Sequence, residues 1–390
     1  MGLVRKIAIA ILLISFFTFA AFFGRLPALR NTPIGFLYRV LWIHIPRGLT
    51  RIDQALTGGR ISTTTKRYAH TLWNDRHPLV MIFFILLLSI SELLFLPPAW
   101  LLMTPFRRIF GSILLLLPYL LLYTSAASDP GYITPSNLSP SWTLYPYDFT
   151  IYHPGQTCRT CRTLKPARSK HCAICKRCIS KMDHHCIFIN NCVGYNNQHW
   201  FLLLLLSTAI LISYAAYVGL SLLSGEILKN LSSWTITGKG YTWAQYLNIW
   251  GWALQEYTRI GAVTLLCLLT APLVWGLLGY HLYLIWAGTT TNETMKWSDW
   301  TAEMADGFVF KCSIPADRRK DLTVESRVTS WPAESQQVLE RTEDGKPPRK
   351  LDVPGVGEWE RVWTLADIEN LYDLGFLDNL KDVFLRRKEQ

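Results

Sequence analysis

The chain has 390 residues and a formal net charge of +11, and half of its residues are hydrophobic. The length allows about two domains, but this apolar content excludes a chain built only from ordinary soluble domains. The positive charge does not require nucleic acid, because it is concentrated in loops between apolar stretches, where it favours an anionic membrane surface. The sequence contains no module that recognises DNA or RNA.

Five apolar stretches account for the hydrophobic excess, at 7–23, 78–98, 109–127, 200–223 and roughly 261–286. Each comes close to the ~20 residues that cross a hydrocarbon core of about 30 Å. Glu92 is the one Asp, Glu, Lys or Arg residue within them. The pattern predicts an all-α polytopic membrane protein with about five transmembrane helices. The alternative interpretation of the first stretch is a cleaved signal peptide, but Phe22-Phe23-Gly24-Arg25 lacks the small residues of a cleavage site.

The loops predict the orientation of these helices. Residues 25–77 contain nine Lys and Arg and residues 128–199 contain eight, against two in 99–108 and three in 224–259. The positive-inside rule places the two richer loops in the cytosol and the amino terminus outside or in the lumen.

The resulting domain organisation runs as follows along the chain. We expect a first transmembrane segment at 1–24, a cytosolic basic loop at 25–77, transmembrane helices 2 and 3 within 78–127, a cytosolic cysteine-rich domain at 128–199, transmembrane helix 4 at 200–223, a luminal loop at 224–259, transmembrane helix 5 at 260–286 and a cytosolic tail at 287–390. Within the tail, the polar and Pro-rich stretch 325–356 predicts a linker or disorder. Leu365, Ile368, Leu371 and Tyr372 then recur at helical spacing.

Seven of the nine cysteines lie between residues 158 and 192, together with three histidines. A disulfide network does not suit a cytosolic loop, where thiols stay reduced. Paired C-x2-C spacings with interleaved histidines instead predict zinc. Two structural zinc ions take four ligands each, so two of the ten candidate ligands remain.

Neighbouring side chains in extended backbone point to opposite faces, so adjacent candidates do not share one ion. This favours an interleaved assignment with two sets of four ligands: Cys158, Cys161, His171 and Cys178 for one zinc, and Cys172, Cys175, His185 and Cys192 for the other. His184 and Cys186 are left over, with Asp183 beside them. A cysteine with a histidine and an aspartate is the set that an activated thiol nucleophile needs. The alternative is that Cys186 is one more zinc ligand.

Residues 158–201 resemble, over their whole length, the cysteine-rich domain of the DHHC-type protein S-acyltransferases, or palmitoyltransferases. Three further motifs follow the family order: Asp129-Pro130-Gly131 after the third span; Thr290-Thr291 and Glu293 after the last span; and 370–384, which contains Tyr372 and Asn379. The resemblance implies that Cys186 takes an acyl group from long-chain acyl-CoA and passes it to a cysteine of a membrane protein. It further implies that His184 activates Cys186, that Asp183 orients it and that His185 binds zinc.

One position departs from the family pattern, because Ile187-Phe188 stands where most members have Pro-Trp. This change, the long first cytosolic loop and the fifth span resemble the fungal spore-wall-formation branch. Members of that branch reside in the endoplasmic reticulum and act on juxtamembrane cysteines of transmembrane proteins such as SNAREs. For this chain we therefore expect the endoplasmic reticulum membrane, with the Golgi membrane as second choice. Because of Ile187-Phe188, the sequence does not determine the preferred acyl-chain length or the rate of acyl transfer.

The expected ligands and partners are two zinc ions, acyl-CoA, membrane protein substrates and the lipid bilayer, and no residue indicates an accessory subunit. A C16 chain gains about 0.8 kcal/mol per buried CH2, so a cavity among the spans is its natural site. Arg168, Lys170 and Lys181 are candidates for the CoA phosphates, although a solvated basic face explains them as well. We expect Thr290, Thr291, Tyr372 and Asn379 to hold the tail against the core. A RING ubiquitin ligase fits the spacing poorly, and a catalytically silent zinc scaffold remains the other alternative.

Overall fold

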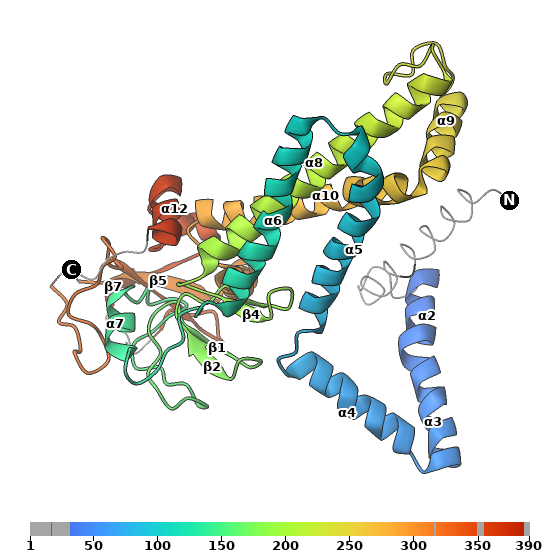
Figure 1. Ribbon diagram of the computed structural model, residues 1–390. Coiled ribbons are helices and arrows are strands. Elements are labelled where there is room, and N and C mark those ends of the chain that lie inside the picture. The colour runs from blue at the N-terminus through green and yellow to red at the C-terminus, as the bar shows by residue number, and fades with distance from the viewer. Residues whose placement is uncertain (1–16, 18–31, 316, 349–354, 386–390) are drawn as a thin grey trace. The chain divides into compact units, whose positions relative to one another are not determined.

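A computed structural model describes residues 17, 32–315, 317–348 and 355–385 (Figure 1). The chain divides into two units, one of Met1–Asp75 with Leu247–Gly251 and the other of Arg76–Tyr246 with Trp252–Gln390. The described residues are mainly helical, with short strands confined to the cysteine-rich region and the tail. The predicted all-α class is confirmed.

Among the described residues, four helices are long and apolar enough to cross a membrane: α5 (Leu79–Leu102), α6 (Pro105–Ala127), α8 (Gln198–Asn230) and α10 (Thr258–Trp286). They contain the last four predicted spans. The first predicted span, 7–23, lies outside the described residues apart from Phe17. Helix α8 packs against both α6 and α10, and α5 packs against α10. These four helices therefore bury part of their apolar surface against one another, and the rest of that surface is exposed.

The segment predicted as a loop at 224–259 is largely helical. Helix α8 continues to Asn230, and Glu226 and Lys229 form an ion pair of 2.6 Å along its last turns. A separate helix, α9 (Trp243–Glu256), then starts at Thr242, whose side chain caps it together with Gln245.

The segment predicted as a basic loop at 25–77 is helical in its described part. It contains α2 (Pro33–Arg39), a π-helical turn η2 (Val40–His44), α3 (Ile45–Thr57) and α4 (Arg60–Asn74). Two glycines with positive φ, Gly58 and Gly59, allow the turn between α3 and α4. The buried Asp53 carboxylate accepts a hydrogen bond of 2.7 Å from the Ser62 N–H and stabilises that turn.

The cysteine-rich region follows the short helix α7 (Leu138–Thr143) and folds as two β-hairpins. Strands β1 (Lys170–Cys172) and β2 (Arg177–Ile179) form the first, and β3 (His184–Cys186) and β4 (Asn191–Val193) form the second. Such short strands have few backbone hydrogen bonds, so bound metal is the natural source of their stability.

The tail contains more structure than predicted. After α11 (Thr291–Ala305) it forms a three-stranded antiparallel sheet in the order β6 (Gln337–Arg341), β5 (Val309–Ser313) and β7 (Val356–Arg361). The prediction of a linker at 325–356 was therefore wrong for β6, whose Val338 and Leu339 are buried. Residues 349–354 lie outside the described part of the chain.

The helical spacing of 365–372 was also misleading. Residues Leu365–Asp367 form a 3-10 turn (η3), and the final helix α12 (Phe376–Phe384) begins only after Gly375, whose φ is +87°. Leu371 and Tyr372 are buried in a core that the tail shares with residues 145–152. Tertiary packing overrode the local periodicity here.

Buried charged residues join the tail to the cysteine-rich region. The Arg168 guanidinium donates to both Glu293 carboxylate oxygens, at 2.8 and 2.6 Å, and stacks over the Tyr145 and Tyr372 rings. Lys181 pairs with Asp382 of α12 at 2.7 Å. The members of both pairs are almost fully buried. Removing one partner from such a pair leaves an uncompensated charge in the core.

We therefore expect Arg168→Met to lower the free energy of unfolding by about 3–5 kcal/mol, because the Glu293 carboxylate would remain buried and unpaired. The midpoint of thermal unfolding in detergent measures this effect. Lys381→Ala is the matched control, since it breaks an exposed ion pair with Asp378 and should leave the midpoint almost unchanged. Equal midpoints for Arg168→Met and the wild type would contradict the structural role.

Candidate active site and metal centres

Two groups of Cys and His side chains gather in the cysteine-rich region. One contains Cys158, Cys161, His171 and Cys178, and the other contains Cys172, Cys175, His185 and Cys192. The ligand atoms of each group all lie within 4.8 Å of one another. These are the two sets that the interleaved assignment proposed.

The hairpins explain how the sets interleave. His171 lies opposite Cys178 in the first hairpin, and His185 lies opposite Cys192 in the second. Cys172 and Cys175 stand at the turn of the first hairpin, yet they belong with the histidine of the second. Each hairpin thus supplies ligands to the second group, which connects the two hairpins.

The spacing of the ligand atoms fits tetrahedral zinc. With ordinary zinc–ligand distances, sulfur and nitrogen lie about 3.6 Å apart and two sulfurs about 3.8 Å apart. The His171 Nδ1 lies 3.3–3.8 Å from the three sulfurs of its group. The His185 Nδ1 lies 3.4–3.7 Å from its three, and the Cys175 and Cys192 sulfurs are 3.5 Å apart. Both groups could therefore hold zinc.

Strand β3 separates the metal site from a second cluster. His185 points toward the sulfurs, so its neighbours His184 and Cys186 face the other way. The His184 Nδ1 donates to the Asp183 carboxylate at 2.7 Å, and the His184 ring and the Cys186 thiol each act on the pKa of the other. Asp183 and Cys186 are buried, at 2% and 8% exposed. The structure thus brings Asp183, His184 and Cys186 together outside the two groups of Cys and His ligands.

The electrostatics of this cluster favour a charged pair. Burial acts against the charged imidazolium, but hydrogen bonds and charges of Asp183 and Cys186 outweigh it and raise the pKa of His184 to about 10. Burial also acts against the Cys186 thiolate, yet His184 and the backbone N–H groups of Ile189 and Phe188 lower the pKa of this thiol. A thiolate beside an imidazolium is the reactive form of a nucleophilic cysteine.

The motif after the last span contacts Asp183 directly. The Thr291 backbone N–H donates to the Asp183 carboxylate. Thr290 and Glu293 form a reciprocal capping box at the start of α11, and Glu293 also binds Arg168. Through these contacts, α11 holds Asp183 in place.

The other predicted motif residues lie in packing contacts. The Asp129 carboxylate accepts hydrogen bonds from the Gly131 and Tyr132 N–H groups, and Pro130 is buried between them. The Tyr372 hydroxyl donates to the Pro146 carbonyl at 2.9 Å, and Asn379 donates to the Ile285 carbonyl at the end of α10.

Sequence reasoning missed two residues at this site, Asn191 and His281. Asn191 on β4 donates to the carbonyls of Ser125, Ala126 and Ser128 at the end of α6, beside which β4 lies in Figure 1. His281 on α10 lies with Asp183 and His184. A polar residue inside an apolar span was the signal for His281, and the doubled Asn190-Asn191 was too weak a signal for Asn191.

An apolar cavity of about 250 Å³ lies among α5, α6, α8 and α10. Phe188, two residues after Cys186, forms part of its wall and contacts Phe84 of α5 edge-on, with the ring centres 6.2 Å apart. One of the two residues that depart from the family pattern, Phe188, therefore lines this cavity, two residues after Cys186.

The structure corrects two of the expected CoA ligands. Arg168 and Lys181 are buried in the ion pairs with Glu293 and Asp382, so neither is available to a phosphate in solvent. Lys170 is exposed at the start of β1. Burial and the nearby charges of Lys170 and Lys165 lower the pKa of Lys296, although Glu293 acts in the opposite direction. Lys165 and Lys170 thus lie near enough to Lys296 for their charges to act on it.

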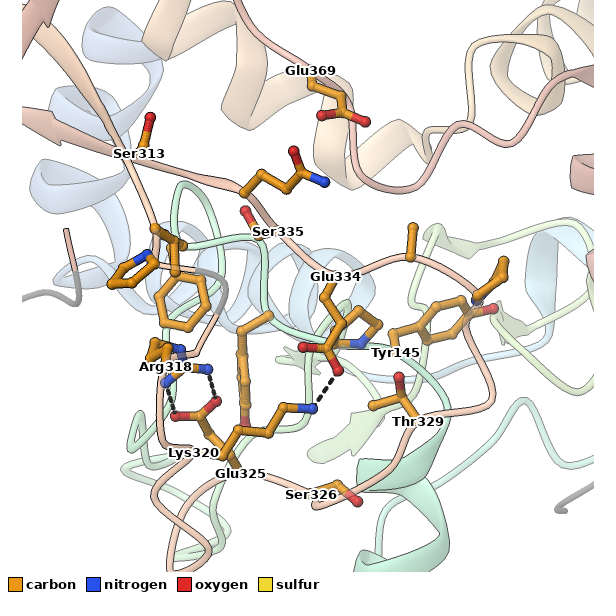
Figure 2. A pocket seen from close by; sticks show the side chains of 18 of the residues that line it. Tyr145, Ser313, Arg318, Lys320, Glu325, Ser326, Thr329, Glu334, Ser335 and Glu369 are labelled. Carbon is orange, nitrogen blue, oxygen red and sulfur yellow. Dashed lines mark hydrogen bonds and ion pairs between the residues drawn. The ribbon is translucent and has the colours of Figure 1, made fainter. Parts of the chain in front are cut away.

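A larger pocket of about 660 Å³ lies between residues 142–149 and the tail (Figure 2). Four of its charged side chains form two ion pairs: Figure 2 shows Arg318 paired with Glu325, and Lys320 paired with Glu334. Tyr145 lies in its wall, but no residue of the Asp183, His184 and Cys186 cluster does. We therefore place the chemistry at Cys186 and not in this pocket.

The chain is similar to known proteins over most of its length. Residues 151–298 match the family model described as DHHC palmitoyltransferase. The protein named Palmitoyltransferase SWF1 in Neurospora crassa is 55% identical over 99% of this chain and 93% of its own. Palmitoyltransferase swf1 of Emericella nidulans is 44% identical over 98% and 97%, and that of Schizosaccharomyces pombe is 32% identical over 94% and 92%.

These likenesses favour an acyltransferase over a membrane ubiquitin ligase, and they confirm the predicted family and branch. The chain belongs to the DHHC palmitoyltransferase family, in its fungal spore-wall-formation branch.

Proposed function

We propose that this palmitoyltransferase works through an acyl-enzyme on Cys186. The alignment of Asp183, His184 and Cys186 beside an apolar cavity carries the proposal. The Cys186 thiolate attacks the carbonyl carbon of palmitoyl-CoA or another long-chain acyl-CoA. The bond from this carbon to the CoA sulfur breaks, and the departing CoA thiolate takes the proton of the His184 imidazolium.

The second step returns the site to its starting state. Neutral His184 takes the proton of a cysteine thiol on the protein substrate, and the resulting thiolate attacks the acyl-enzyme. Cys186 leaves as a thiolate beside the restored imidazolium. Asp183 stays ionised throughout and holds the His184 ring in place. Each zinc, when bound, supplies rigidity and no chemistry to this scheme.

The apolar cavity supports an acyl chain as the transferred group. Its lining comes from four membrane-capable helices and is almost entirely apolar, and Phe188 connects it to the nucleophile. An acyl chain bound in this cavity stays out of water while its thioester reacts with Cys186. Cys186 itself lies in the same apolar cluster as Leu122 and Phe201.

For the CoA phosphates we propose Lys170 together with Lys165 and Lys296. Lys170 is exposed, and its charge and that of Lys165 act on Lys296. Lysines bind phosphate groups as point charges without demanding a fixed geometry.

The protein substrates are proposed to be membrane proteins with cytosolic cysteines next to a transmembrane segment, such as SNAREs. The positive-inside charge counts support a cytosolic cysteine-rich region and tail. We propose the endoplasmic reticulum as the compartment, in keeping with the branch, and the Golgi as second choice.

Cys186→Ala should abolish covalent labelling by radioactive palmitoyl-CoA and keep the zinc content. Wild-type protein purified in detergent should carry label that hydroxylamine removes, because hydroxylamine cleaves thioesters. Gel autoradiography and metal analysis measure the two quantities. Unlabelled wild type that is folded and full of zinc would instead identify a silent zinc scaffold.

Cys192→Ala should lower the zinc content by about one ion per chain and lower the midpoint of thermal unfolding, because metal binding and folding of this region are linked. Cys312→Ala is the matched control, since Cys312 is a buried free cysteine outside both metal groups. Unchanged zinc in Cys192→Ala would refute the ligand assignment.

Lys170→Gln should raise the KM for palmitoyl-CoA by roughly 10-fold, since a hydrogen bond to a charged group contributes about 1.5–3 kcal/mol. The KM for palmitoyl-N-acetylcysteamine, which has the same thioester but no phosphates, should not change. Lys176→Gln, also exposed in the first hairpin, controls for the loss of one charge. Equal effects on both donors would exclude a phosphate contact.

A further inference from the structure

His281 is a buried histidine of α10 that none of the sequence motifs contains. Its side chain is 5% exposed, and its Nδ1 lies 3.6 Å from the Asp183 Oδ2. Its ring centre lies 5.5 Å from that of His184 and 5.0 Å from that of Phe201. The second histidine of the active site thus comes from a membrane helix and not from the cysteine-rich region.

The Asp183 carboxylate is the point where three parts of the chain meet. Its Oδ2 accepts the His184 N–H from β3, and its Oδ1 accepts the Thr291 N–H from α11. A carboxylate oxygen has two lone pairs, so Oδ2 can face both histidines. At 3.6 Å the contact with His281 exceeds a hydrogen bond, but the attraction between the carboxylate charge and the imidazole dipole still acts at that distance in a buried site.

Phe201 of α8 completes this arrangement. Its ring lies edge-on to His184, with centres 5.3 Å apart, and edge-on to His281. The two imidazoles are tilted by only 31° to one another. His281 is therefore held on one side by an aromatic ring and on the other by the Asp183 carboxylate.

The same two helices also form the wall of the apolar cavity. Val274 of α10 lines the cavity seven residues before His281, and Thr208 of α8 lines it seven residues after Phe201. Seven residues are about two helical turns, so each pair lies on one face of its helix. On both α8 and α10, the face that lines the cavity for the acyl chain is therefore the face that, nearer to Cys186, supports the imidazoles of His184 and His281.

We propose that His281 is a positioning residue for acyl transfer, which keeps the Asp183 carboxylate in the orientation that directs His184 at Cys186. The proposal rests on the acyl-enzyme function proposed above. His281 touches neither the acyl group nor the reacting sulfur, and it acts on the rate through Asp183.

The test compares two substitutions in the full-length protein in lipid nanodiscs. His281→Phe keeps a flat ring but has no polar atom for Asp183, whereas His281→Asn keeps an amide donor close to the position of Nδ1. Leu282→Ala, a more exposed neighbour on α10, is the control for a change in this helix. The initial rate of Cys186 acylation is measured over a range of palmitoyl-CoA concentrations, together with zinc content and thermal midpoint.

We expect His281→Phe to lower kcat by about 10- to 100-fold, as is usual for residues that orient a functional group, with the KM and the zinc content unchanged. His281→Asn should recover most of the loss, and Leu282→Ala should match the wild type. A kcat equal to wild type in His281→Phe would overturn the proposal, as would an Asn variant that folds, holds zinc and is as slow as the Phe variant. Absence of acylation in the wild type itself would instead reject the proposed function.

Discussion

Successive side chains of an extended strand point to opposite faces, and the active site depends on this property of the three residues of β3. His185 turns toward the metal group, so His184 and Cys186 turn together toward α8 and α10. Any shift of pairing by one residue would exchange the two faces. The register of β3 with β4, in which His185 lies opposite Cys192, therefore keeps Cys186 on the face away from the second group of Cys and His ligands.

The tail is an integral part of the structure around Asp183. Asp183 receives a hydrogen bond from Thr291, while Lys181, two residues earlier, is paired with Asp382 of α12. The Tyr145 hydroxyl donates to the same Asp382 oxygen. Charged groups in an apolar core are costly unless each has its partner, so these contacts specify one arrangement of the segments that carry them.

The zinc ligand sets and the Asp183, His184 and Cys186 cluster could be predicted because they follow from counting and from strand geometry. The four described spans could be predicted because apolar length alone determines them. The sheet of the tail could not, since β6 pairs with β5 across more than twenty residues and short strands carry little local signal. Arg168 and Lys181 look like solvent-exposed cations in the sequence, and only the tertiary structure reveals their buried partners. His281 escaped for the same reason, as its partner Asp183 lies far away in the chain.

The attachment of β4 to α6 has a consequence for the geometry of the reaction. Asn191 is bonded to the last carbonyls of a membrane helix, and Cys186 lies directly opposite it in the hairpin. Protein hydrogen bonds thus fix the position of the thiol relative to the end of α6. Under the proposed function, a substrate cysteine has to reach that position, so its distance from the end of its own membrane span counts for more than the residues on either side of it.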